Sequence, residues 1–230
     1  MRLTIVTLLI IITLNAFGQN NFSRINRDSV KLLISDRSKE TYYPELMERF
    51  NQFDTTLTLE DYRLLYFGFV FQKEYSGDFY PKQQEITQLI HEKKFDLAIK
   101  TCDSILEKVP VSLIVNYLKG FAIYMNRNTD SNYLHYRNRY SKLREAILST
   151  GNGLTCGSSF QTIFVSDDYE IMYRYFQIPE YEKQYLVYKC DEFEIKPSKY
   201  FPSHAIYFDA SEPLLNTEER LKKKLGNCSN

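Results

Sequence analysis

The chain has 230 residues, of which 43% are hydrophobic and 25% are charged. This composition suits one globular domain or two small ones, and it excludes a chain that is disordered throughout. Lys and Arg number 29, and so do Asp and Glu, so the formal net charge is zero. Because a nucleic-acid-binding protein or a polybasic membrane anchor needs an excess of positive charge, we expect neither activity.

The first 18 residues have the pattern of a secretory signal peptide. Arg2 supplies a positive charge, residues 3–14 form an apolar run broken only by threonines, and Ala16 and Gly18 are the small residues that precede a cleavage site. The apolar run is shorter than the ~20 residues that span a bilayer. The sequence therefore predicts export to the periplasm or the exterior, a mature chain that starts at Gln19, and no transmembrane segment in that mature chain.

Residues 19–150 are predicted to form a helical region. Residues 43–53 are predicted to form a helix with Pro44 in its first turn, where the missing N–H of proline is harmless. Thr58 and Asp61 have the spacing of a capping box at the start of a second helix. Nearly every side chain from 64 to 71 is apolar, which indicates a helix buried on most sides and too short to cross a membrane.

Apolar residues at steps of three and four continue from residue 86 to residue 147. This block resembles tetratricopeptide repeats: Phe95 matches the aromatic position at the turn between helices, Ala98 and Gly120 match small packing positions, and Pro110 matches the closing proline. The likeness covers about one and a half repeats, fewer than the three or so that a free-standing solenoid needs. An ordinary antiparallel helical bundle explains the same pattern equally well.

The character of the sequence changes at Gly151. Gly151, Asn152 and Gly153 are a strong turn signal, and the remainder, residues 151–230, is predicted to be rich in strands. The predicted strands are residues 160–165, 169–175, 185–188, 193–195 and 205–208, and residues 217–225 are predicted to form a short terminal helix. For 169–175 a helix capped by Asp167 is the alternative.

Together these elements predict an α+β fold, in which a helical layer with a tetratricopeptide-like hairpin packs with a small antiparallel sheet. Because neither region is large, the two are also compatible with a single cooperative unit.

Two segments give the chain a resemblance to a known family. The first is YPEL at residues 43–46 with LEDYRLLYFGF at residues 59–69; the second is GNGL at residues 151–154 with VSDDYE at residues 165–170. Over nearly all of the mature chain the sequence resembles a family of secreted proteins described as a domain of unknown function, family 4919. The resemblance implies no particular activity. That family usually has an acidic residue where this chain has Asn152, which argues against carboxylate chemistry at that position.

The mature chain has four cysteines: Cys102, Cys156, Cys190 and Cys228. None belongs to a C-x-x-C pair, so neither a zinc ribbon nor a thioredoxin-like site is expected. Four cysteines in an exported protein permit two disulfides in three arrangements. We favour a bond between Cys156 and Cys190, which both lie in the strand-rich region, and expect Cys102 to be a buried thiol on a helix.

Asp167, Asp168 and Glu170 form the densest cluster of acids beside a predicted strand. Paired carboxylates can act as a general acid and base or bind calcium. Their spacing does not match a calcium-binding EF-hand loop, and acids between strands usually form turns by bonding to their own backbone. We therefore expect mainly turn formers here.

The glycine loop and the histidines are the other candidates for chemistry. Backbone N–H groups around Gly151 and Gly153 could bind an anion, but no P-loop lysine follows and a strand succeeds the loop, so a plain connector is favoured. Cys190 and His204 could form a nucleophile pair only if Cys190 were free of a disulfide. The histidines have no H-E-x-x-H spacing, and we expect no metal and no cofactor.

The chain has 19 tyrosines, 16 phenylalanines and no tryptophan. Most of the tyrosines fall on predicted core stripes, and the rest could form a docking surface. We predict an exported, non-enzymatic envelope protein that binds a protein or peptide through the helical hairpin or a tyrosine-bearing face. The alternative is a hydrolase or small-ligand binder that uses the Gly151 loop and the acids Asp167, Asp168 and Glu170.

Overall fold

The computed structural model of the chain describes residues 22–126 and 131–227. The predicted signal peptide and Cys228 lie outside these residues. Within the described ranges, no helix has both the length and the apolar character needed to cross a bilayer.

Three helices open the described chain, and local signals fix where two of them begin. They are α2 (Arg27–Ser35), α3 (Tyr43–Asn51) and α4 (Leu59–Gly68), which continues into the 3-10 turn η1 (Phe69–Phe71). Pro44 lies in the first turn of α3, as predicted. Thr58 and Asp61 form the predicted capping box at the start of α4. All residues of α4 from Tyr62 to Gly68 are buried, which confirms the helix predicted from the apolar run.

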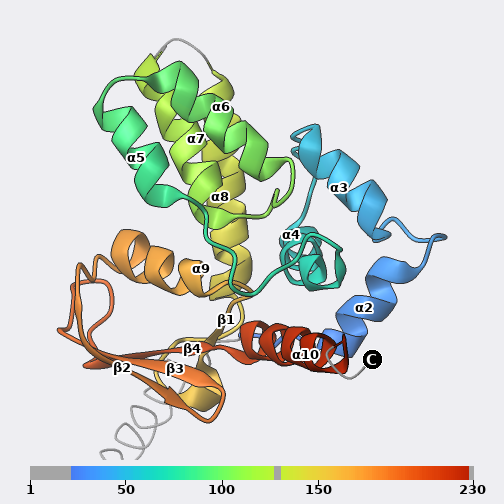
Figure 1. Ribbon diagram of the computed structural model, residues 1–230, viewed down its shortest axis with the longest axis vertical. Helices are drawn as coiled ribbons and strands as arrows, with labels where there is room; N and C mark the ends of the chain where they lie inside the picture. Colours follow the sequence, from blue (N-terminus) through green and yellow to red (C-terminus); the bar gives the residue numbers. More distant parts are fainter. Residues whose placement is uncertain (1–21, 127–130, 228–230) are drawn as a thin grey trace, which may run out of the picture.

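Four further helices form a block (Figure 1), and the first three of them share a small core that is separate from the main one. They are α5 (Gln83–His91), α6 (Phe95–Leu106), α7 (Leu113–Asn126) and α8 (Asn132–Leu148). Helix α6 packs on α5 and α7, and α7 packs on α8. Cys102 lies fully buried among these helices, where burial raises the pKa of its thiol to about 12. The likeness to tetratricopeptide repeats stays a prediction.

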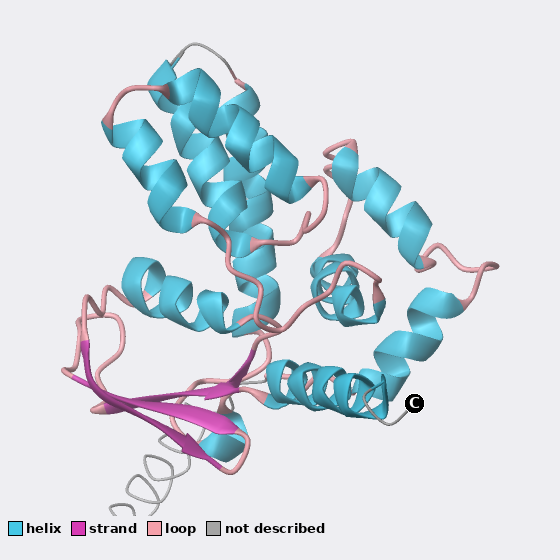
Figure 2. Ribbon diagram, viewed as in Figure 1, coloured by secondary structure: helices cyan, strands magenta, loops and turns pink. Residues whose placement is uncertain are grey.

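The strands gather at one end of the molecule in a four-stranded sheet (Figure 2). They are β1 (Phe160–Gln161), β2 (Tyr181–Val187), β3 (Cys190–Ile195) and β4 (Ala205–Asp209), in the spatial order β1-β4-β3-β2. The pairs β2–β3 and β3–β4 are antiparallel, but β1 is parallel to β4, with Phe160 opposite Phe208. The sheet is therefore mixed, and the prediction of a wholly antiparallel sheet is wrong for β1.

The strand predicted over residues 169–175 is also wrong. Those residues belong to helix α9 (Val165–Glu170) and to the single π-helical turn η3 (Ile171–Tyr175). Tyr169 and Tyr173, which suggested alternation, are four residues apart, and their ring centroids are 6.1 Å apart on one side of the helix. The alternative prediction, a helix capped by Asp167, gives the correct type of element. Its start is wrong, because α9 begins at Val165 and is capped by Phe164. The strand predicted over residues 160–165 is confirmed only for its first two residues, which form β1.

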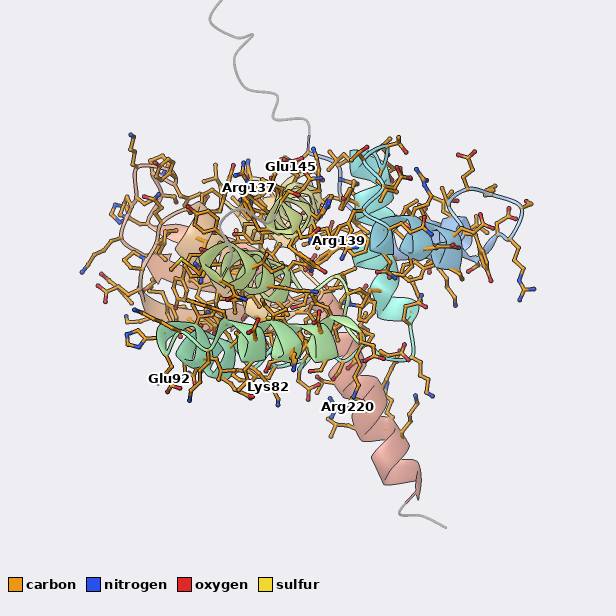
Figure 3. The ribbon with its side chains drawn as sticks, turned by 90° about the horizontal axis from the view of Figure 1, so that it is seen from above. Lys82, Glu92, Arg137, Arg139, Glu145 and Arg220 are labelled. Carbon is orange, nitrogen blue, oxygen red and sulfur yellow. A yellow bond between two sulfur atoms is a disulfide. The ribbon has the colours of Figure 1, made fainter. Side chains whose placement is uncertain are left out.

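The C-terminal helix α10 (Ser211–Asn227) is longer than the helix predicted over residues 217–225. The carboxylate of Asp209 accepts a hydrogen bond from the N–H of Ser211 where α10 begins. Arg220 forms an ion pair with Asp78, which ties α10 to the segment before α5. Beyond Arg220 the helix extends away from the body of the molecule (Figure 3).

The main apolar core is shared by the helical and the strand-rich regions. Leu65 of α4, Ile147 of α8, Phe164 before α9 and Phe208 of β4 are all fully buried members of one cluster. Helix α9 lies between the helical block and the sheet (Figure 1) and contributes to this cluster through Tyr169. The α+β fold is thereby confirmed, and its core continues across residue 151.

Candidate functional site

Helix α9 carries the three acids selected from the sequence, and all three are buried. The hydroxyl of Tyr66 on α4 donates a hydrogen bond to Oδ2 of Asp167 over 2.6 Å and accepts one from the N–H of Ile163 over 3.1 Å. The other carboxylate oxygen of Asp167 is buried without a hydrogen-bond partner among the described residues. Burial raises the pKa of Asp167 to about 8, with a further upward contribution from Glu170.

Asp168 accepts a hydrogen bond from the Thr162 hydroxyl over 2.7 Å. Burial raises its pKa well above the ordinary value, and the nearby carboxylates of Asp191, Asp167 and Asp209 raise it further. The prediction that these acids are turn formers is therefore wrong. They lie in a helix and in the core, because α9 is enclosed between α4, the helical block and the sheet.

Glu170 joins α9 to the helical block. Its Oε1 lies 2.9 Å from Nε of Arg174, four residues later in the π-helical turn, and the nearby hydroxyl of Tyr140 on α8 acts to lower its pKa. Burial raises the pKa of Glu170 to about 7, although Arg174 acts in the opposite direction. The guanidinium of Arg174 lies 4.0 Å from the ring centre of Tyr117 on α7. The π-helical turn thus places a positive charge against an aromatic ring of the helical block.

This arrangement can hold protons near neutral pH, but a catalytic site also needs a hollow beside its acids. None of the five cavities that we describe in residues 22–126 and 131–227 is lined by Asp167, Asp168 or Glu170. The same residue ranges contain no group of three or more His, Cys, Asp or Glu side chains placed to hold a metal ion. Asp167 does fix α9 to α4 by its bond with Tyr66, whereas Asp168 bonds to Thr162 in the short segment that leads into α9.

A hollow lined by aromatic side chains lies between α7 and α8 and was not predicted from the sequence. It has a volume of about 350 Å³, and we call it the α7–α8 groove; its lining residues are Tyr117, Gly120, Phe121, Tyr124, Tyr133 and Arg137. The rings of Tyr117 and Phe121 are stacked with centroids 6.2 Å apart, and Tyr124 meets Tyr133 edge-on at 5.2 Å. Phe121 is 38% exposed and Tyr124 45% exposed.

The sequence placed Tyr117, Tyr124 and Tyr133 on core stripes. Tyr117 does pack against both apolar cores, and Tyr133 is half-buried, but Tyr124 is exposed, so the prediction is wrong for Tyr124. Helix α7 is apolar on more than one face, so one face fills the small core and another remains for the groove. The only signal that could have found the groove is this excess of aromatic residues on α7.

A family model described as "Domain of unknown function (DUF4919)" matches residues 28–220. The chain belongs to the DUF4919 family. This match confirms the resemblance found in the sequence, and it includes the α7–α8 groove and all three acids of α9. Comparison of the chain with the curated proteins gave no match, and comparison with the solved structures gave none.

The glycine loop of this DUF4919 chain is shaped by packing. The N–H groups of Asn152 and Gly153 both donate to the carbonyl of Ser158, so they point into the loop and not toward an anion. Gly153 has φ +69°, and a Cβ there would lie 2.4 Å from the Phe160 ring. At Gly151 a Cβ would lie 2.3 Å from the carbonyl oxygen of Ser159. Asn152 itself accepts a hydrogen bond from the N–H of Leu154.

Cys156 and Cys190 of the DUF4919 chain form a disulfide, the pair that the sequence favoured. It fastens the loop after Gly153 to β3. Because the sulfur of Cys190 is bonded to Cys156, it cannot act as the thiol of a Cys190–His204 nucleophile pair. His204 is exposed, and it precedes β4.

Proposed function

We propose that this DUF4919 protein is an exported, non-enzymatic binding module of the cell envelope, whose α7–α8 groove takes an apolar, carboxylate-bearing segment of a partner protein or peptide. The observation that carries this proposal is the groove itself, where four aromatic rings and one arginine line a hollow of about 350 Å³. Export rests on the signal-peptide pattern of the first 18 residues.

The side chains of the groove are of the kind that dominates binding energy at protein interfaces. Tyrosine and arginine are enriched among such residues, since each offers a large contact area together with a hydrogen-bonding group. Arg137 on α8 (labelled in Figure 3) is exposed and forms no ion pair with any described acid. A carboxylate on the partner would therefore complete the charge on this wall of the groove.

The groove is also held in shape before any ligand arrives. The ring of Tyr117 packs between Arg174 and Tyr140, with ring centroids of Tyr117 and Tyr140 5.2 Å apart. Below it, the buried Lys119 of α7 bonds to Asp103 of α6 and to the Tyr136 hydroxyl of α8. A preformed site lowers the entropy lost on binding, which favours useful affinity from a small contact area.

The test is selection of a phage-displayed random peptide library on immobilised protein comprising residues 19–230. We expect the selected peptides to share an aromatic or large aliphatic residue near an Asp or Glu. Their binding should weaken by about tenfold or more in Phe121→Ala and in Arg137→Glu, as expected for central interface residues. Tyr200→Ala is the matched control, because Tyr200 is 51% exposed and lies away from the groove in the segment before β4. Peptides that ignore both groove variants would refute the proposal.

The alternative function, a hydrolase or small-ligand binder at the acids of α9, is favoured by one observation. Glu170 is buried beside Arg174 with its pKa raised to about 7, close to the value that suits a general acid or base. Assays with chromogenic esters, glycosides and phosphate esters test it. Turnover that is lost in Glu170→Gln but kept in Phe121→Ala would establish this alternative in place of the groove.

A further inference from the structure

A second and larger hollow lies on another side of the helical block. Two cavities, of about 780 Å³ and about 600 Å³, share the lining residues Glu74, Glu107 and Lys108, and we call the two together the trough. The residues that line the trough come from α3, from η1 and the segment after it, and from the end of α6 with the turn before α7. These elements can be followed in Figure 1. Pro110 marks its end, three residues before α7 begins, whereas the α7–α8 groove starts at Tyr117.

Apolar side chains form much of the trough. Those that come from α3, η1 and the α6–α7 turn are Pro44, Met47, Phe69, Val109 and Pro110. At one rim Tyr80 is 66% exposed, the largest exposure of any aromatic side chain along the trough. This combination of an apolar floor with an exposed aromatic rim suits an extended segment of another chain.

The charges along the trough are mainly negative. Glu48, Glu74 and Glu107 are exposed, and none of them forms an ion pair with a described residue. Two lysines line the trough; Lys82 is already paired with Glu85 at 3.3 Å, which leaves Lys108 against three carboxylates. Electrostatic complementarity selects partners by such differences and speeds their encounter.

We infer that this trough is a second docking surface, which takes an extended segment with basic and apolar side chains from a partner protein. The inference does not depend on the α7–α8 groove, where the charge has the opposite sign. The two surfaces would let one chain bind two partners of different chemistry.

The experiment measures the fluorescence anisotropy of a labelled peptide made of Lys-Leu-Ser repeats, titrated with protein comprising residues 19–230. Two matched peptides replace every Lys by Glu or by Ser. The test variant is Glu74→Gln/Glu107→Gln, which removes two charges while keeping side-chain size. Glu180→Gln/Glu182→Gln is the control, because these acids are exposed at β2, away from the trough. Phe121→Ala reports separately on the α7–α8 groove.

We expect the Lys peptide to bind more tightly than both matched peptides and to weaken about fivefold or more in Glu74→Gln/Glu107→Gln, with little change in the control or in Phe121→Ala. Hydrogen exchange should slow on binding in residues 44–52, 72–80 and 104–110. Equal binding of the Lys and Ser peptides would overturn the inference, as would equal loss in both Gln pairs. Analytical sedimentation tests for self-association. A dimer of the protein that no longer binds the Lys peptide would overturn the inference and assign the trough to a second copy of the chain.

Discussion

The hydroxyl of Tyr66 donates a hydrogen bond to Asp167 over 2.6 Å in the centre of the molecule. This bond joins α4 to α9. The start of α4 is fixed by its own capping box, whereas in the region of α9 the sequence predicted a strand and gave a helix only as the alternative. The same hydroxyl accepts the N–H of Ile163. One buried tyrosine therefore satisfies a backbone donor and a carboxyl group that water cannot reach.

Replacing Tyr66 by Phe should lower the free energy of unfolding by about 2 kcal/mol, because the change leaves a buried N–H and a buried carboxyl oxygen without a partner. Tyr43→Phe is the matched control. Tyr43 is also buried, but its hydroxyl bonds only to the carbonyl of Leu65, so about half that loss is expected. Urea unfolding measures both variants, and equal losses would contradict the special role of Tyr66.

The buried acids predict that stability falls as pH rises. Burial raises the pKa of Asp167 from 3.8 to about 8 and that of Glu170 from 4.5 to about 7. At a pH between the ordinary pKa and the raised pKa of each acid, the native state therefore binds more protons than the unfolded state. Stability from both groups is fully present below about pH 4 and is lost as pH rises toward 8, by at most about 1.4 kcal/mol per pH unit for each group.

Urea unfolding between about pH 5 and pH 8 measures this slope. Asp167→Asn/Glu170→Gln should reduce this slope, since the amides keep the shape of the acids but do not titrate, while Asp168, whose pKa is also raised, keeps part of it. A wild-type free energy of unfolding that is constant over this range would show that the acids are ionised at no cost to the fold.

The glycine loop predicts a sharp difference between neighbouring glycines. Gly153→Ala should destabilise the protein by about 2 to 4 kcal/mol, because its φ of +69° is strained for alanine and the new Cβ would meet the Phe160 ring at 2.4 Å. Gly157→Ala should change stability by less than about 0.5 kcal/mol, since its Cβ would meet only Thr155 Oγ1, at 3.9 Å. Thermal unfolding compares the two variants. Equal losses of stability in Gly153→Ala and Gly157→Ala would contradict the prediction, because they would show that the φ of Gly153 and its contact with Phe160 have no special effect.

The disulfide predicts a loss of stability on reduction. Cys156 and Cys190 are 34 residues apart, and closing a loop of that length in the unfolded chain stabilises the native state by about 3 to 4 kcal/mol. Cys156→Ala/Cys190→Ala should lose that amount. A reductant should destabilise the wild type to a similar extent and leave the double variant unchanged; a wild type insensitive to reductant would argue that the bond does not form.

Local signals in the sequence located most helices, because capping boxes, prolines and three-to-four spacing act over a few residues. Pro44, Thr58 and Asp61 could thus be read correctly without knowledge of the fold. The strand predicted at residues 169–175 failed for the same reason: tyrosines at every second position are compatible with a strand, and only enclosure of Ile171 and Met172 in the core selects the helix.

The candidate sites depended on tertiary structure much more. The sequence identified Asp167, Asp168 and Glu170 as a cluster, but it could not show that Asp167 meets Tyr66 of α4 or that Glu170 lies near Tyr140 of α8, residues that are distant in sequence. The α7–α8 groove and the trough are formed between helices, so no single segment reveals them.

From the sequence alone came the family, the α+β class and the favoured pairing of Cys156 with Cys190, and export remains a prediction from the same source. These follow from composition, short motifs and residue spacing, which are properties of the chain itself. Only the tertiary structure decided that β1 is parallel to β4, that the acids of α9 are buried, and that aromatic side chains of α7 remain exposed. Whether a side chain is buried depends on which elements pack against it, and these elements are far apart in the sequence. For the acids of α9, burial follows from the enclosure of this helix between the helical block and the sheet.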